Sequence, residues 1–564
     1  MNGSSRRATF RIVVGLSLLV TIGGGGAEAQ VGPQVRVDTL NPNSGVETAI
    51  AVSRINSLEV VAAAIDWRLG INEGPRIGYA ITRNGGASFA TEDYIRLPVG
   101  HPLAAVKWEV DPFAAADPVT GDIWVGGVVI QGATSPSGVF VARKALGAGV
   151  LGSTILVTSH AAGGFQDDKP LMAVGRRPGS PSQTTQYVVF SRKLDPTLVP
   201  GAPGPCTSVH LVLARSRDAG QTWDIRNVAP TPHPGLSTTF HCQYNGLGAA
   251  PVVLSSGRLV VVWRDALANS PYDGDYLAAY SDDEGDTWNA PPSSPPSSLP
   301  WNLFPDPPVR KALVTDIAGK FRLPSLPGIA VDPVNDDVYV VVSARKSVVS
   351  TNLDVWVTRS TDGGVTFAAP ERLPLDDTDF EDAPDQIMPW IAIDRADGVA
   401  AMNILYYDTR HHVVSDASDV AYLDAYHARI KGWGSGNWQI VNTRLTPTTF
   451  DTSVQYEAYL LDPFANADLD QFIGDYQMID AAGCHIYPNY MSLQTATRHY
   501  YLHHVTSSCD ADMDGNSAVN GADASLFQNI LFPSGDPLAD ADHTGSVTAA
   551  DVTAFLSAYA GGGP

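Results

Sequence analysis

The chain has 564 residues and a formal net charge of -23, which argues against nucleic acid and against anionic membrane surfaces as partners. Glycine (52 residues) and proline (41 residues) are abundant, and only 17% of the residues are charged. This composition favours an all-β protein with many turns, and the length corresponds to several ordinary domains or to one large repeat unit with additions.

Residues 1–29 have the organisation of an export signal peptide. Arg6, Arg7 and Arg11 form a basic region, residues 12–22 are apolar, and Ala27-Glu28-Ala29 is a small-residue cleavage site. The apolar run is too short and too interrupted by glycine to cross a membrane, and no later segment could do so. We therefore expect an exported protein that is not membrane-spanning: secreted, extracellular, or attached to a cell surface.

An eight-residue motif recurs along the chain, each time between an apolar run and a short extended run. It reads T-R-N-G-G-A-S-F at 82–89, S-R-D-A-G-Q-T-W at 216–223, S-D-D-E-G-D-T-W at 281–288 and S-T-D-G-G-V-T-F at 360–367. The aspartate at position three, replaced by Asn84 in the first and weaker copy, can accept hydrogen bonds from the downstream backbone, and the glycine at position five can take a positive φ. The motif therefore predicts hairpin turns, and its recurrence predicts a repeat architecture.

This motif, S-x-D-x-G-x-T-W, resembles the Asp box (BNR repeat) of sialidase-like β-propellers, and the resemblance implies such a propeller over residues 34–507. Blades are expected to begin near residues 47, 107, 167, 243, 322, 385 and 472. The last unit has about three strands, so the run at 34–40 is expected to supply its outer strand and close the ring. The sequence predicts seven blades; the resemblance to catalytic sialidases favours six as the alternative.

Four cysteines, an even number, fit an oxidising compartment. Three pairings are possible, and we favour Cys206–Cys242 and Cys484–Cys509 because each pair is close in chain order. Free thiols are the alternative. An acidic run at 374–385 is interpreted as a solvated loop, with calcium binding as the alternative. The pairs His411-His412 and His503-His504 are interpreted as surface-loop residues.

Residues 508–564 carry two twelve-residue loops with oxygen-bearing side chains at alternate positions, each followed by an apolar helical run. The duplication resembles a type I dockerin, an α-helical module with aspartate at loop position twelve. The resemblance implies Ca²⁺ binding and a cohesin-type protein partner, whereas an acidic linker is the alternative. Ser517 replaces the preferred glycine of the first loop. The expected calcium ligands are Asp512, Asp514, Asn516, Ala518, Asp523, Asp540, Asp542, Thr544, Ser546 and Asp551.

The inner strands of a propeller begin on the face opposite the predicted hairpin turns, so the turns are expected to be structural. Arginine, carboxylate and tryptophan residues collect on the inner-strand face, which suits a carbohydrate, above all an acidic one, because arginine binds carboxylates bidentately. The family resemblance implies an arginine triad, a tyrosine nucleophile and an acid/base aspartate. By position, the candidate catalytic residues are Arg264, Arg345, Arg410, Asp168 and Tyr407.

Two hypotheses follow from the sequence. The first is a secreted sialidase-like glycoside hydrolase that acts on extracellular glycans or polysaccharides and is tethered through the dockerin-like module. The second is a non-catalytic propeller that binds glycan or protein through the same face, with Arg–Asp pairs such as Asp408/Arg410 joining the blades. Arginines that converge on one carboxylate would favour the first hypothesis.

Overall fold

A computed structural model describes the region from residue 30 to residue 506, with gaps, and two residues near the C-terminus. The predicted signal peptide and all ten expected calcium ligands lie outside the described residues. No helix in the described part of the chain has the length and apolar character needed to cross a membrane. The described ranges are 30–39, 45–69, 74–97, 100–101, 103–104, 106, 108–130, 135–162, 164–194, 209–228, 244–267, 270–289, 291, 310–311, 323, 325–345, 352–375, 384–395, 399–411, 422–433, 438–452, 473–493, 499–506, 552 and 556.

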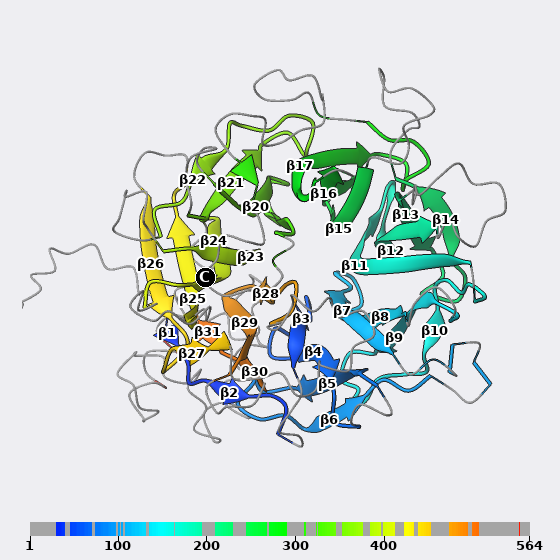
Figure 1. Cartoon of the computed structure of the whole chain (residues 1–564), viewed down its shortest axis with the longest axis horizontal. Helices are drawn as coiled ribbons and strands as arrows, with labels where there is room; N and C mark the ends of the chain where they lie inside the picture. The colour runs from blue at the N-terminus through cyan, green and yellow to red at the C-terminus, as the bar shows by residue number, and fades with distance from the viewer. Residues whose placement is uncertain are drawn as a thin grey trace, which may run out of the picture.

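Seven antiparallel sheets surround a central axis (Figure 1), so the prediction of a seven-bladed, all-β propeller is confirmed. Within each blade the first strand lies nearest the axis and the later strands follow outward. The first three blades are β3 (Val46–Val52), β4 (Val60–Asp66), β5 (Arg76–Thr82) and β6 (Thr91–Tyr94); β7 (Glu109–Ala116), β8 (Ile123–Val129), β9 (Gly138–Lys144) and β10 (Ile155–Leu156); β11 (Phe165–Arg177), β12 (Ser180–Leu194), β13 (Val209–Ser216) and β14 (Asp224–Asn227).

Blades four to six repeat this order with small variations at their outer strands. In blade four the described residues form three strands, and an isolated bridge between Tyr280 and Asn289 follows the third. The strands are β15 (Tyr244–Val253), β16 (Leu259–Leu267) and β17 (Ser270–Ser281); β18 (Arg310–Lys311), β19 (Gly328–Val331), β20 (Val338–Arg345), β21 (Asp354–Ser360) and β22 (Glu371–Arg372); β23 (Gln386–Asp394), β24 (Ala401–Asp408), β25 (Tyr422–Lys431), β26 (Gln439–Arg444) and β27 (Phe450–Asp451).

The seventh blade joins the two ends of the propeller. Its strands β28 (Met478–Ala482), which is the inner one, β29 (His485–Ser492), β30 (His499–Leu502) and β31 (Val505–Thr506) come from the end of the described propeller. Its outer strand comes from the start: β2 (Val35–Arg36) pairs with β30, and β1 (Gln30–Val31) pairs with β31. The predicted closure by the 34–40 run is confirmed, and the additional pairing of residues 30–31 was not anticipated.

The interpretation of His503-His504 as surface-loop residues is wrong. The chain bends between β30 and β31, and this bend turns both rings inward. His503 is buried and contacts the Gly32 carbonyl oxygen at 3.0 Å and the Tyr490 hydroxyl at 3.1 Å. His504 stacks on Tyr487 with ring centroids 4.8 Å apart. The histidines therefore help to hold the N-terminal strand in the seventh blade.

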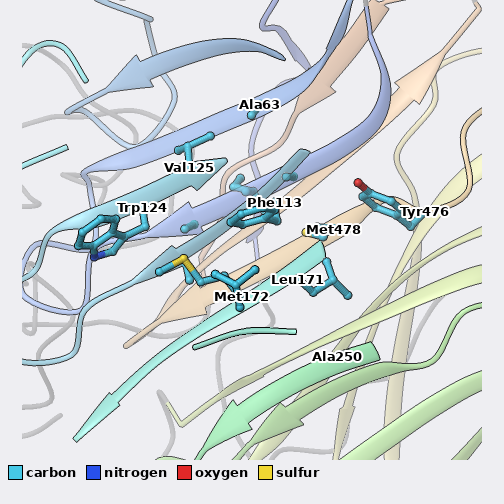
Figure 2. Packing of buried hydrophobic residues seen from close by; sticks show 14 of the residues in the cluster. Ala63, Phe113, Trp124, Val125, Leu171, Met172, Ala250, Tyr476 and Met478 are labelled. Carbon is cyan, nitrogen blue, oxygen red and sulfur yellow. The ribbon is translucent and has the colours of Figure 1, made fainter. Parts of the chain in front are cut away.

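Large apolar side chains fill the space between neighbouring blades. Figure 2 shows Phe113 of β7 between the inner strands, with Leu171 and Met172 of β11 nearby, and Tyr476 beside Met478 of β28. These strands consist of short apolar runs that are buried on both faces, which is the pattern expected when each sheet packs between two others. The packing fixes the strand ends, from which the polar side chains project.

The repeated octapeptides form equivalent turns. In the 281–288 copy, Ser281 Oγ accepts a hydrogen bond from Gly285 N at 2.7 Å, and Asp283 accepts bonds from Thr287 N at 2.8 Å and Thr287 Oγ1 at 2.6 Å. Gly285 has a φ of 90°, and a Cβ there would lie 2.2 Å from Leu213 of blade three. The turn therefore needs glycine both for its backbone and for its contact with the preceding blade.

Replacing Asp283 with alanine is expected to lower the free energy of unfolding by about 1–3 kcal/mol, because three hydrogen bonds to a charged carboxylate, from Ser281 Oγ, Thr287 N and Thr287 Oγ1, are lost. Urea denaturation measures this change. The neighbouring exposed Asp282, which pairs with Arg258 at 2.6 Å, is the matched control. Its alanine variant is expected to change stability by less than about 1 kcal/mol. Equal effects at the two positions would contradict the role given to the turn.

Candidate functional site

The two faces of the propeller differ in what they carry. We call the face where the inner strands begin the upper face, and the face with the repeated turns and the inner hairpins the lower face. A cavity of about 500 Å³ runs along the axis toward the lower face. It is lined by apolar residues such as Leu171, Met172 and Met478 and by charged residues such as Arg54, Asp394 and Arg395. The polar and charged residues at the starts of the inner strands lie at the other end.

A buried charge cluster joins four blades at the upper end of the axis. Lys169 Nζ of blade three lies 2.8 Å from Glu47 Oε1 of blade one, 2.6 Å from Asp111 Oδ1 of blade two and 2.5 Å from Asp475 Oδ2 of blade seven. All four residues are buried. The hydroxyl of Tyr476 also donates a hydrogen bond across blades, to the Pro112 carbonyl at 2.7 Å.

The backbone aims these side chains at the axis. Glu47, Asp111 and Lys169 have positive φ angles of 54°, 53° and 49°, and so do Ser325 and Met388 of blades five and six. In four of these five strands the positive-φ residue coincides with a register shift against the second strand of the blade. Such bulges redirect a side chain, and strained backbone is found where surrounding structure holds it in place.

The electrostatics of the cluster favour one retained proton. Burial raises the pKa of Glu47 well above its ordinary value; the Lys169 charge opposes this rise, whereas Asp111 and Asp475 add to it. Glu47 Oε2 is buried and has no hydrogen-bond partner among the described residues. One ammonium group among three carboxylates leaves negative charge in excess, and a proton on Glu47 reduces it. The cluster holds the ring together and offers little surface to a substrate.

Arg410, the first of the predicted arginines, is held by partners in its own blade and by the carbonyl oxygen of Leu375, which follows blade five, at 3.1 Å. Its guanidinium pairs with Asp408 at 2.6 Å, donates to the Tyr406 hydroxyl at 3.2 Å and lies 4.2 Å from the centre of the Tyr426 ring. Blade one contains the same D-x-R arrangement, in which Arg68 N donates to Asp66 Oδ1 at 2.8 Å. The repetition assigns the Asp408/Arg410 pair a structural role in its blade.

The other two predicted arginines lie on neighbouring blades in different surroundings. Arg264 is buried on β16 near Tyr276. Burial raises the pKa of Tyr276, and the charge of Arg264 partly opposes this rise. Arg345 ends β20 at the upper face, and burial lowers its pKa while the charge of Asp385 opposes this change. Arg345 therefore lies next to an acidic group that the candidate set did not include.

Tyr407 and Asp168 complete the predicted set. Tyr407 is 1% exposed, and its hydroxyl donates to the Met491 carbonyl oxygen at 2.7 Å and accepts from Met491 N at 3.1 Å. These bonds join blades six and seven, and burial raises the pKa of the hydroxyl. Asp168 is half-buried on β11, beside the charge cluster, where it contributes to the raised pKa of Tyr476.

Asp385 has the environment of a proton donor. It precedes β23 at the upper face and is half-buried, and its Oδ1 accepts a hydrogen bond from Leu353 N at 2.8 Å. Burial raises the pKa of Asp385 to about 7; the Leu353 hydrogen bond and the Arg345 charge oppose the rise. The interpretation of the 374–385 run as solvated does not describe this residue. Its position before an inner strand predicts that it lies on the upper face, but does not distinguish it from the other carboxyl groups there.

A second upper-face carboxyl group titrates in the same range. Burial raises the pKa of Glu109 to about 7. Two interactions oppose this rise: the charge of Arg76, whose Nε lies 3.7 Å from Glu109 Oε1, and a hydrogen bond from Ile77 N. The neighbouring Trp67 and Trp108 rings meet edge to face at 5.6 Å. Glu109 is buried beneath this upper-face region and is not placed to contact a ligand. Its titration is therefore expected to change the stability of the protein rather than ligand binding.

Replacing Glu109 with glutamine is expected to stabilise the protein by about 1–3 kcal/mol at pH 8, and by less at pH 5. The folded pKa of Glu109 lies above its unfolded value, so its stabilising contribution is present below pH 4 and lost as the pH rises to about 7. Glutamine does not ionise and avoids this loss. Denaturation midpoints at both pH values measure the difference, and the exposed Glu371→Gln variant is the control. An E109Q effect independent of pH would contradict the assignment.

Neither protein-family models nor curated proteins match this chain. Among solved structures, a protein of unknown function from Dyadobacter fermentans aligns at 13% identity over 85% of this chain and 99% of its own, with a TM-score of 0.43. The Hadza microbial sialidase Hz136 aligns at 16% identity over 66% of each chain, with a TM-score of 0.41. The arabinofuranosidase of Fusarium graminearum aligns at 9% identity over 85% of this chain and 98% of its own, with a TM-score of 0.39.

Proposed function

We propose that this chain is an exported, glycan-active propeller whose upper face carries out sialidase-like glycoside hydrolysis. The observation that carries the proposal is Asp385, a half-buried carboxyl group with a pKa of about 7 beside the buried cation Arg345. A general acid works best when its pKa lies near the working pH, and enzymes raise carboxyl pKa values by burial to reach that range.

The two residues suit the two demands of hydrolysing an acidic glycoside. Arg345 attracts a substrate carboxylate to the upper face, with Arg264 on the adjacent blade as a second cation. Neutral Asp385 gives its proton to the glycosidic oxygen as the bond to the anomeric carbon breaks and the alcohol leaves. Water then adds its hydroxyl group to that carbon and gives its other proton to the Asp385 carboxylate, which restores the acid. The Tyr407 hydroxyl is hydrogen-bonded to the Met491 backbone and is therefore not free to act as the nucleophile. We propose that water, and not Tyr407, attacks the anomeric carbon.

The C-terminal segment is proposed to be a dockerin-like module that binds Ca²⁺ and tethers the propeller to a cohesin-type protein partner. Support comes from the sequence of the two loops, in which carboxylate, amide, hydroxyl and backbone oxygens recur at the spacing that Ca²⁺ requires. Export to an oxidising compartment is supported by the signal peptide that the sequence of residues 1–29 predicts and by Cys484, which is disulfide-bonded.

A non-catalytic propeller that binds glycans is the second candidate. It is favoured by the structural use of Arg410 and Tyr407, two of the residues that a sialidase-like mechanism would need at its centre. In this case Arg345 and the upper-face tryptophans would contact the glycan, and Asp385 would bind rather than react.

Hydrolysis of a panel of fluorogenic glycosides by the full chain in calcium tests the proposal. The panel contains sialosides, uronides and neutral glycosides. Release from an acidic glycoside, and not from its neutral counterpart, is the expected result. If calcium-loaded, folded protein releases nothing but retains acidic glycans on an array, the binding function replaces the catalytic one. Protein that neither cleaves nor binds any glycan contradicts both.

A further inference from the structure

Cys484 lies at the lower face, in the hairpin between β28 and β29. It is 2% exposed and disulfide-bonded, and its partner lies outside the described residues. The same hairpin contributes Ala481, Ala482 and Gly483 to the wall of the axial cavity. A segment joined to Cys484 is therefore held at the lower mouth of that cavity.

The topology distinguishes the three cysteines that could be the partner. Cys509 follows Thr506 by three residues, and Thr506 pairs with His485, the residue after Cys484. Three residues span at most about 10 Å, and a disulfide needs Cα atoms about 4.4–6.8 Å apart, so the chain can return to Cys484 within this length.

The other two cysteines adjoin strand ends on the opposite face. Cys206 precedes β13 by three residues, and β13 begins where it pairs with Lys193, near the upper end of β12. Cys242 precedes the inner strand β15 by two residues, and inner strands begin at the upper face. A bond from either residue to Cys484 would have to pass from one face of the propeller to the other.

We propose that Cys484 is bonded to Cys509 and that the segment 508–564 packs against the lower mouth of the cavity. Exposed apolar residues occur in three inner hairpins of the lower face: Val334 (67% exposed), which lines the cavity, in the hairpin after β19, Ile55 (42%) in the hairpin after β3, and Val399 (52%) in the hairpin after β23. The segment carries apolar runs at 525–532 and 552–559. A tether of a few residues raises their effective concentration at the mouth to about millimolar.

The bond forms by thiol–disulfide exchange, in which the two thiols lose two electrons and two protons to a disulfide oxidant of the export compartment. With the segment on the lower face, the upper face with Asp385 and Arg345 stays open to a large ligand. The inference does not depend on which function that face performs.

Peptide mapping of the full chain under non-reducing conditions tests the bond. Linked peptides containing Cys484 and Cys509, together with linked Cys206 and Cys242, are expected. A peptide that links Cys484 to Cys206 or Cys242 would overturn the proposal.

Hydrogen exchange in calcium tests the packing. In a Val334→Asp/Val399→Asp variant, whose changes are at exposed sites, exchange in peptides covering 525–532 and 552–559 is expected to rise about tenfold as the segment leaves the mouth. The control is Val150→Asp, at a 59% exposed position in the turn after β9, which is expected to leave that exchange unchanged. Unchanged exchange in the double variant would overturn the packing, even with the disulfide in place.

Discussion

Replacing Lys169 with methionine is expected to destabilise the propeller by about 3–5 kcal/mol at pH 8, because the change leaves buried carboxylates without their cation. Glu47, Asp111 and Asp475 each lie within 2.8 Å of the Lys169 ammonium and come from three different blades. The loss should be smaller at pH 5, because protonation of Glu47, whose pKa is raised by burial, reduces the buried negative charge. Guanidinium denaturation midpoints at the two pH values measure both effects.

Lys144 is the matched control for this prediction. It is also buried, but it pairs with a single carboxylate, Glu59, which keeps a second donor in Gly147 N at 3.1 Å. Lys144→Met is therefore expected to destabilise the protein less than Lys169→Met. Glu47→Gln is expected to be near neutral, since Glu47 already favours its protonated form. A Lys169→Met variant as stable as the wild type at pH 8 would contradict the role of the cluster.

Replacing Asp385 with asparagine is expected to lower kcat by about 10²–10⁴-fold with a smaller change in KM, because asparagine cannot donate the catalytic proton. The asparagine side-chain oxygen can still accept the hydrogen bond from Leu353 N, so the local structure is preserved. Steady-state kinetics on the best glycoside of the panel measure the change.

The control for the asparagine variant is Asp282→Asn at the lower face, where an exposed carboxylate pairs with Arg258. This variant should retain wild-type kcat. Equal losses in the two variants would point to a general effect on the fold. A D385N variant with wild-type kcat would remove Asp385 from the mechanism.

The ring itself could be predicted from the sequence because its signals are local. The repeated turn depends on a few neighbouring residues, such as Ser281, Asp283 and Gly285, and the strand periodicity is equally short-range. Closure by residues 34–40 followed from counting strands in the last unit. The inward turn of His503 could not be predicted, since it depends on a contact with Gly32, which lies 471 residues away in the chain.

The candidate site was only partly predictable, because its geometry also depends on contacts between residues that are far apart in the chain. Asp111, Lys169 and Asp475 could each be placed at the start of an inner strand, but their convergence on one ammonium group depends on bulges in separate blades. The raised pKa of Asp385 depends on desolvation by the folded chain, which composition and spacing do not contain. Sequence reasoning therefore placed these residues at the starts of the inner strands, and the structure adds the burial that raises the pKa of Asp385. That this face is the functional one stays a prediction.

The pH dependence of kcat/KM for the wild type and for Asp385→Asn tests the central proposal most directly. Because Asp385 must be protonated to act as the acid, wild-type kcat/KM is expected to fall as the pH rises through about 7. This alkaline limb should be absent from the residual activity of the variant. The same alkaline limb in both proteins would contradict the assignment of the catalytic proton to Asp385.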